Sequence, residues 1–370
     1  MANRRQFITG LLATGLTPVP SWADVGSPAF LSAALRDDGA YVLCGISARC
    51  DVLFQIPLPA RGHAAAAHPN RPLAVAFARR PGRFAQVIDC TTGQPMATLN
   101  APSGRHFYGH GVFSQDGAWL YTTENDYDAG TGRVGVWDVA AGFARTGEFT
   151  SGGIGPHDIK RLPGSDVLVV ANGGIDTHPD SGRTKLNIPT MRPNLAYIND
   201  GEVVETVELD HTHHKNSIRH LAMADDGTVA FGMQWQGDIP APPLVGTHQR
   251  GGKPHIFAIA SDPLRQMQGY VGSITFNHDG TEVIATSPRG GIVQRYDRST
   301  GTLIGQMQLE DACGVAKTSG DVIVTTGTGK IVGLDRDQAT RHAALQWDIA
   351  TKTNNKGQTH NQYITSPTSW

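Results

Sequence analysis

The sequence has little charge and no long apolar run. Asp, Glu, Lys and Arg make up 17% of its 370 residues, and the formal net charge is −2. This balance gives no electrostatic case for a nucleic-acid-binding protein or for a protein drawn to an anionic membrane. No run of 18 apolar residues occurs, so no transmembrane helix is expected.

Several enzyme and cofactor signatures are also missing. The four cysteines form no Cys-x-x-Cys pair, which argues against a thioredoxin-type site and against covalently bound c-type haem. The chain has no Gly-x-Ser-x-Gly nucleophile elbow, no Walker phosphate loop and no His-Glu-x-x-His helix. No hydrolase triad, nucleotide site or zinc-protease site is therefore assigned from sequence.

The N-terminus has the form of an export signal. Arg4 and Arg5 precede Gln-Phe-Ile, a mild apolar stretch follows, and small residues precede Asp24. Paired arginines in this setting are typical of a twin-arginine signal. We therefore expect residues 1–23 to be a signal peptide, residues 24–370 to form one domain, and the protein to be periplasmic. An ordinary secretory signal is the alternative.

One pattern recurs through the rest of the chain: an apolar stretch, a tight turn, and a strand rich in Val, Ala, Thr or Tyr. With 44 Gly and 22 Pro, the composition also favours β structure with many turns. Seven copies predict an all-β fold, a seven-bladed β-propeller of the WD40/YVTN-like type, rather than a large sandwich or solenoid. A C-terminal strand near residues 345–349 is expected to close the ring. The turns are Asp38-Gly39, Asn70-Arg71, Asp116-Gly117, Gly164-Ser165, Asp226-Gly227, Asp279-Gly280 and Ser319-Gly320.

Histidine recurs at one position of this repeat, six or seven residues before the turn. Four of the seven copies carry it, and Ser32, Ser273 and Cys313 occupy the other three positions. A propeller brings equivalent inner-strand positions together around its axis, so four imidazoles should meet there. The four are His63, His110, His157 and His220.

Neutral imidazole binds Fe, Cu, Zn and Ni, so the repeated histidines predict a metal site. We expect iron, with copper or zinc as alternatives. Two other interpretations stay open: structural histidines bonded to channel water, and an anion-binding funnel if the rings are protonated.

The loops after the second strands should form a rim on the same face as the histidines. Glu124 or Asp126 could orient a ligating imidazole, and the arginines could receive a carboxylate or phosphate. Two longer connections, residues 173–194 and 236–254, should project from that face and are candidates for function. The candidate rim residues are Arg79, Arg83, Glu124, Asp126, Asn172, Gln234, Arg289 and Cys313.

Cys44 and Cys50 are close enough in sequence to bridge a hairpin in an oxidising compartment. Two separate buried thiols are the alternative, and sequence does not decide between them.

The chain resembles an uncharacterised family of exported bacterial propellers that are encoded beside imelysin-type iron-uptake proteins and a di-haem peroxidase-like protein. The resemblance rests on stretches spread over most of the chain, and Asp158 replaces a glutamate of the pattern. The stretches include PARGH (59–63), FYGHGVFSQDG (107–117), GIGPHD (153–158), VVANGGIDTHPDSGRTKLN (169–187), SIRHLA (217–222) and TSPRGG (286–291).

This resemblance implies periplasmic iron acquisition, with imelysin-like or di-haem peroxidase-like proteins as partners. Two other hypotheses remain: a metal-dependent oxidase or oxygenase that uses the same histidines, and a metal-free scaffold for protein interactions.

Overall fold

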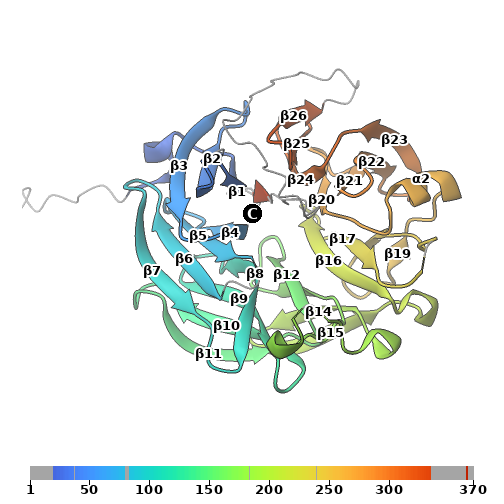
Figure 1. The fold of residues 1–370 in the computed structure, drawn as a ribbon, viewed down its shortest axis with the longest axis horizontal. Helices are drawn as coiled ribbons and strands as arrows, with labels where there is room; N and C mark the ends of the chain where they lie inside the picture. Colours follow the sequence, from blue (N-terminus) through green and yellow to red (C-terminus); the bar gives the residue numbers. More distant parts are fainter. Residues whose placement is uncertain are drawn as a thin grey trace, which may run out of the picture.

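The computed structural model is a ring of seven β-sheets around a central axis (Figure 1). It describes residues 20–36, 38–79, 83–182, 184–238, 240–334 and 364–365. The all-β, seven-bladed propeller expected from the repeats is confirmed. Residues 1–19 of the expected signal segment lie outside the described residues, and Trp22–Val25 forms a short 3-10 helix, η1. No helix in the described part of the chain is long and apolar enough to cross a membrane.

Each of the seven turns predicted from sequence joins the first and second strands of a blade. The first three blades contain β1 (Phe30–Leu35), β2 (Tyr41–Ile46) and β3 (Val52–Leu58); β4 (Gly62–Ala67), β5 (Leu73–Ala78), β6 (Phe84–Asp89) and β7 (Gln94–Asn100); and β8 (Arg105–Phe113), β9 (Trp119–Asp126), β10 (Thr131–Asp138) and β11 (Ala144–Thr150).

The remaining blades follow the same order from the axis outwards. They contain β12 (Pro156–Arg161), β13 (Leu168–Asn172), β14 (Asn194–Asn199) and β15 (Glu202–Glu208); β16 (Asn216–Met223), β17 (Val229–Trp235), β18 (Val245–His248) and β19 (His255–Ile256); β20 (Ser273–Phe276), β21 (Glu282–Ser287), β22 (Ile292–Asp297) and β23 (Leu303–Gln308); and β24 (Ala312–Lys317), β25 (Val322–Thr326) and β26 (Ile331–Leu334).

Short helices occupy the longer connections. In the connection at residues 173–194 lie η2 (Pro179–Ser181) and η3 (Ile188–Thr190), and η4 (His211–His213) precedes β16. The helix α2 (Ser261–Gln266) precedes β20. The connection at residues 236–254 is partly a strand, since β18 lies within it.

The ring is closed by the C-terminal strand β27 (Ile364–Thr365), which pairs antiparallel with β1 (Figure 1). The closing strand therefore comes later than residues 345–349, where sequence placed it and which lie outside the described residues. β27 contacts β1, β4 and β24. β27 lies on the axial side of β1, so the first blade has four strands. The other three, β1, β2 and β3, come from one continuous segment near the N-terminus.

The hydrophobic core is divided among the interfaces between neighbouring blades. In β13, Val169 and Ala171 pack towards the fifth blade, whereas Leu168 and Val170 pack towards the third. Successive side chains of a strand point to opposite faces, so a strand packed on both sides must be apolar throughout. This explains the continuous apolar runs that follow the turns.

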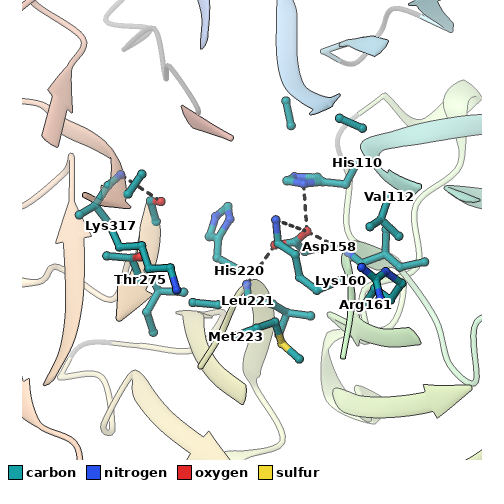
Figure 2. Close-up of a pocket in the computed structure, with 18 of the residues that line it drawn as sticks. His110, Val112, Asp158, Lys160, Arg161, His220, Leu221, Met223, Thr275 and Lys317 are labelled. Atoms are coloured by element: carbon teal, nitrogen blue, oxygen red, sulfur yellow. Dashed lines mark hydrogen bonds and ion pairs between the residues drawn. The ribbon is translucent and has the colours of Figure 1, made fainter. Parts of the chain in front are cut away.

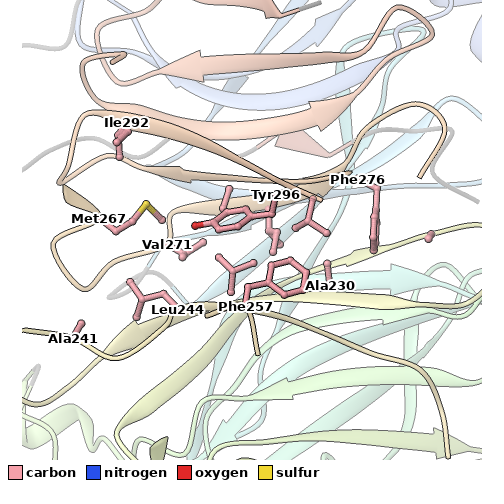
Figure 3. Packing of buried hydrophobic residues seen from close by; sticks show 14 residues of the cluster. Ala230, Ala241, Leu244, Phe257, Met267, Val271, Phe276, Ile292 and Tyr296 are labelled. Carbon is pink, nitrogen blue, oxygen red and sulfur yellow. The ribbon is translucent and has the colours of Figure 1, made fainter. Parts of the chain in front are cut away.

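Aromatic side chains fill the interface between the fifth and sixth blades (Figure 3). Phe257 and Tyr296 lie with ring centroids 5.5 Å apart, and Phe276 and Met267 extend the cluster. Fully burying one such side chain contributes about 1.5–3 kcal/mol. The same kind of cluster joins the seventh blade to the first, where Ala316 and Ile323 pack with Phe30.

His68 makes one blade junction sensitive to pH. Its Nδ1 accepts hydrogen bonds from the backbone N–H groups of Asn70 (3.1 Å) and Arg71 (3.0 Å), and its ring lies against Phe113 of the next blade. Burial and the charge of Arg71 lower the pKa of His68 to about 4.

The unfolded chain therefore binds a proton at His68 between pH 6.5 and about 4 that the folded protein does not bind. We expect the free energy of unfolding to fall as pH decreases through this window, by up to about 1.4 kcal/mol per pH unit from this group. Urea titrations from pH 7 to 4 should show a smaller slope for His68→Asn than for the wild type. Equal slopes would refute this assignment.

Candidate metal centre

The four repeated histidines lie together at the axis. Each comes from the innermost strand of its blade, and each is buried, with 4–9% of its surface exposed. His63, His110 and His157 form one group in which potential ligand nitrogens lie within 4.8 Å of one another. His220 lies beside this group, with its ring centroid 4.9 Å from that of His157 and 6.3 Å from that of His110.

A register shift of the kind that a β-bulge produces occurs at or directly beside the histidine position in the inner strands of the second to fifth blades. The register shifts between Gly62 and Ala65, between Phe107 and Gly111, between Pro156 and Asp158, and between Ile218 and His220. A bulge inserts a residue and changes the direction of the side chains beside it. It thereby allows neighbouring residues such as His157 and Asp158 both to serve the site.

Gly109 allows two of the rings to approach. Its φ of +105° is unfavourable for other residues, and a Cβ there would lie 2.4 Å from Cδ2 of His63. The neighbouring His110 ring lies edge-on to His63, with centroids 5.0 Å apart.

Two of the imidazoles are held through their Nδ1 atoms. His110 Nδ1 lies 3.2 Å from Oδ1 of Asp158, and His157 Nδ1 lies 2.8 Å from the carbonyl oxygen of Arg219. Histidines that bind metals usually donate one ring N–H to a carboxylate or a carbonyl, which leaves the other nitrogen for the metal. Both rings therefore have the arrangement expected of a metal ligand, with Nε2 as the donor atom.

Asp158 connects three blades at this point (Figure 2). Besides His110 of the third blade, its carboxylate accepts hydrogen bonds from the backbone N–H groups of Ile159 (2.8 Å) and Leu221 (3.0 Å). Lys160 Nζ lies 3.9 Å away. Burial alone would raise the pKa of Asp158, but Lys160 and His110 outweigh it and keep that pKa below its usual range. Asp158 is thus buried and carries a negative charge near neutral pH.

The environment keeps two of the imidazoles neutral. Burial, the charge of Arg219 and the neighbouring histidines lower the pKa of His157. Burial and His110 lower the pKa of His220 to about 3, against the opposing effect of Asp158. Neutral imidazole is the form that binds metal, so these two rings are in the ligating state near neutral pH. Protonated rings, which an anion-binding funnel would need, are therefore disfavoured at these two positions.

The histidines separate two pockets. The first, which we call the channel pocket, has a volume of about 130 Å³ and is lined by His110, Asp158, His220 and, farther along the channel, Lys160 and Lys317 (Figure 2). The second, the loop-side pocket, has a volume of about 190 Å³ and is lined by His63 and His157. Its other lining residues are Arg79, Tyr108, Ile175, Thr177, Lys185 and Arg219.

The three-histidine group fits a metal ion after a small contraction. Three equivalent nitrogens, each about 2.1 Å from one ion, lie at most about 3.6 Å apart. Because the nitrogens here lie within 4.8 Å of one another, each ring needs to move inward by about 0.7 Å at most. The site can therefore hold a transition-metal ion through three imidazoles, with other coordination positions left for His220, water or a further ligand.

A family model described as "Protein of unknown function (DUF1513)" matches residues 56–351. The chain belongs to this DUF1513 family. The match covers most of the propeller and includes all four axial histidines. No curated protein matches the sequence.

Among solved structures, the chain is similar to one described as Kuenenia stuttgartiensis hydrazine synthase. The two are 14% identical over 80% of this chain and 91% of that chain, with a TM-score of 0.56. At this level of identity the likeness shows a shared propeller fold and carries no argument about activity.

The carboxylate that orients His110 is Asp158, not Glu124 or Asp126 as the rim pattern suggested. Glu124 is fully buried and accepts hydrogen bonds from Arg145 (2.8 Å) and Thr122 (3.0 Å). Asp126 accepts one from Arg105 (3.2 Å). Both acids belong to an ion-pair network within the third blade, away from the axis.

Glu124 therefore provides a structural counterpart to Asp158. Glu124→Ala should destabilise the fold by about 3 kcal/mol, the lower end of the cost of breaking a buried ion pair, because Arg145 keeps some contact with solvent. Metal content should stay at the wild-type level. Denaturant titration and metal analysis of the same sample check both parts, and loss of metal from a folded variant would contradict this assignment.

The other rim residues divide between the pocket and the scaffold. Arg79 lines the loop-side pocket, whereas Arg83 is exposed and Arg289 stacks on Tyr270, 4.4 Å from its ring centroid.

Asn172 is buried and donates hydrogen bonds to Ser151 O (2.7 Å) and Asn194 Oδ1 (2.9 Å). Gln234 donates to Val271 O (3.1 Å), and Cys313 donates to Asp311 (3.3 Å).

All four cysteines are buried free thiols, so the alternative without a Cys44–Cys50 bridge is the one that the structure supports. Cys44 and Cys50 both pack in the cluster between the seventh and first blades. Burial raises the pKa of Cys44 to about 12, which disfavours the reactive thiolate.

Sequence reasoning missed Asp158, Tyr108, Lys185 and Arg219 as site residues. Asp158 and Arg219 are immediate neighbours of histidines that it did identify, so adjacency to a repeated histidine was the usable signal. Lys185, with Ile175 and Thr177, comes from the connection at residues 173–194. That connection therefore contributes to a pocket beside the histidines, as its length suggested.

Proposed function

We propose that this protein binds one transition-metal ion at the propeller axis through His63, His110 and His157, with His220 beside them. The observation that carries the proposal is the convergence of three buried imidazoles from three consecutive blades, with potential ligand nitrogens within 4.8 Å. The fixed Nδ1 atoms of His110 and His157 support it, because structural histidines do not require their second nitrogens to converge.

Iron is the metal that we propose, with copper and zinc as alternatives. A set of neutral imidazoles suits Fe, Cu and Zn and does not suit Mg or Ca, which prefer oxygen ligands. When bound, the metal would supply Lewis-acid or redox chemistry. The chain's own contribution is to fix the imidazoles through Asp158 and the Arg219 carbonyl. It also limits the approach to the metal to the two pockets.

We propose further that the protein is exported by the twin-arginine route and serves iron acquisition in the periplasm, with imelysin-like or di-haem peroxidase-like partners. Arg4 and Arg5 and the family resemblance support this role. Fractionation of cells that express the wild type and a variant with Lys at both positions tests the export step. A variant that still reaches the periplasm would contradict export by the twin-arginine route.

A metal-dependent oxidase is the second candidate. It is favoured by the two pockets, which reach the histidines from opposite sides and leave access for a small substrate. Oxygen consumption by the metal-loaded protein with a ferrous or organic substrate distinguishes this activity from metal binding alone.

Metal analysis of the exported protein tests the proposal. We expect about one equivalent of iron, retained through gel filtration. A variant of the exposed His211 serves as the control for surface histidines, since His211 stacks on His214 away from the axis. No bound metal, and none after anaerobic loading with Fe(II), Cu(I) or Zn(II), would overturn the proposal and favour the metal-free scaffold.

A further inference from the structure

The loop-side pocket is positively charged. Arg79 follows β5, Lys185 lies in the connection at residues 173–194, and Arg219 lies in β16, so three separate elements each bring a cation to it. No Asp or Glu is among its lining residues in the described part of the chain. The imidazoles that complete it, His63 and His157, add no negative charge. The pocket is therefore built for a negatively charged occupant.

The cations are brought together at a cost. Burial and the charges of Arg219 and Arg289 lower the pKa of Lys185, and its Nζ donates to the neutral amide oxygen of Gln236 (2.5 Å). The Nη1 atom of Arg79 is buried without a hydrogen-bond partner among the described residues. A buried donor without a partner is unfavourable unless a ligand supplies the acceptor.

The pocket also adjoins the proposed metal. His63 belongs both to the three-histidine group and to the pocket lining, as does His157. The three imidazoles bring no negative charge to a bound cation, the single negative charge of Asp158 is shared with Lys160, and the nearby arginines and lysine increase the local positive potential. An anion in this pocket would balance both charges and offer an oxygen to the metal.

We propose that the loop-side pocket binds a small oxyanion with two or more negative charges, such as a polycarboxylate or phosphate, between Arg79, Lys185 and Arg219. A volume of about 190 Å³ is below the roughly 300–1,000 Å³ of pockets for drug-sized ligands, so the ligand is small. Cations from three elements match an anion whose charge is spread over several oxygens. Contact of this anion with the metal rests on the proposed function, whereas its binding to the three cations does not.

Isothermal titration of the metal-free protein with citrate and with inorganic phosphate tests the pocket. We expect binding of at least one of them at about one equivalent. The dissociation constant should rise about 10–100-fold in Arg79→Gln and in Lys185→Gln, because each loses one charge-assisted contact. Arg83→Gln is the matched control, since Arg83 is exposed and does not line the pocket.

Binding of citrate alone identifies a carboxylate ligand, binding of phosphate alone identifies a phosphate ligand, and either result supports the pocket. Absence of binding to the metal-free and metal-loaded wild type, or equal affinities in all variants, would overturn the inference. Circular dichroism checks that each variant is folded. Metal content is measured in parallel, so a protein that binds metal but no anion refutes only the pocket, and one that binds anion but no metal refutes only the metal site.

Discussion

Replacement of His110 by alanine is expected to release the metal. His110 is the central member of the set: its ring centroid lies 5.0 Å from those of both His63 and His157. Removing it leaves two members of the three-histidine group and also removes the partner of Asp158. The loss of affinity should exceed the roughly 10–100-fold that follows loss of an outer hydrogen-bond partner.

Competition with a chromogenic chelator measures this effect directly. His211→Ala should keep the wild-type affinity, because His211 is exposed and lies outside the axial group. The folded state of His110→Ala is checked by its urea midpoint. A folded His110→Ala protein that holds metal as tightly as the wild type would show that the axial histidines are not the ligands.

Asp158→Asn should weaken metal binding by about 10–100-fold while all four histidines are retained. The substitution would preserve the shape of the side chain and one acceptor oxygen, but it would remove the negative charge 3.2 Å from His110 Nδ1. The ring of His110 would then be a weaker donor. The neighbouring Lys160 would also lose its compensating charge and make the site less favourable for a cation.

Because Asp158 acts through His110, stability alone does not test its role. The informative comparison is with Glu124→Ala, which removes another buried carboxylate without touching the axis. We expect Asp158→Asn to change metal affinity more than stability and Glu124→Ala to do the reverse. Equal affinity in Asp158→Asn and the wild type would show that the carboxylate has no part in metal binding.

The sequence predicts the blades well because each is specified locally. A tight turn such as Asp116-Gly117 between two apolar stretches determines a hairpin without reference to the rest of the chain. The equivalence of the seven hairpins then places His63, His110, His157 and His220 at the axis. The repeat therefore identifies the four axial histidines from sequence alone.

The partners of these histidines depend on side-chain direction, which the repeat does not specify. Sequence placed Glu124 in a loop after a second strand, yet it lies within β9 and its side chain faces Arg145 of its own blade. A shift of one residue in register reverses the face of a strand side chain. The bulge between Pro156 and Asp158 makes such a shift and brings Asp158 to His110. No residue pattern in a single sequence marks that bulge.

The closing strand and the loop-side pocket depend on contacts between distant segments. β27 pairs with β1 across almost the whole chain, and its two residues give no local signal for that partner. The connection that carries Lys185 contacts Asn125 of the third blade through Thr177 O and Gln236 beside the fifth blade through Lys185 itself, and such contacts are set by tertiary packing. Length alone indicated that this connection was important, but it did not indicate a cation beside the histidines.

Anomalous diffraction from crystals of the metal-loaded protein tests the central claim most directly. Data on both sides of the iron absorption edge, repeated at the copper and zinc edges, locate and identify the ion. We predict one peak on the propeller axis, about 2.0–2.3 Å from a nitrogen of each of His63, His110 and His157. A metal-loaded crystal with no peak at the axis, or with its peak at His211 and His214, would contradict the account.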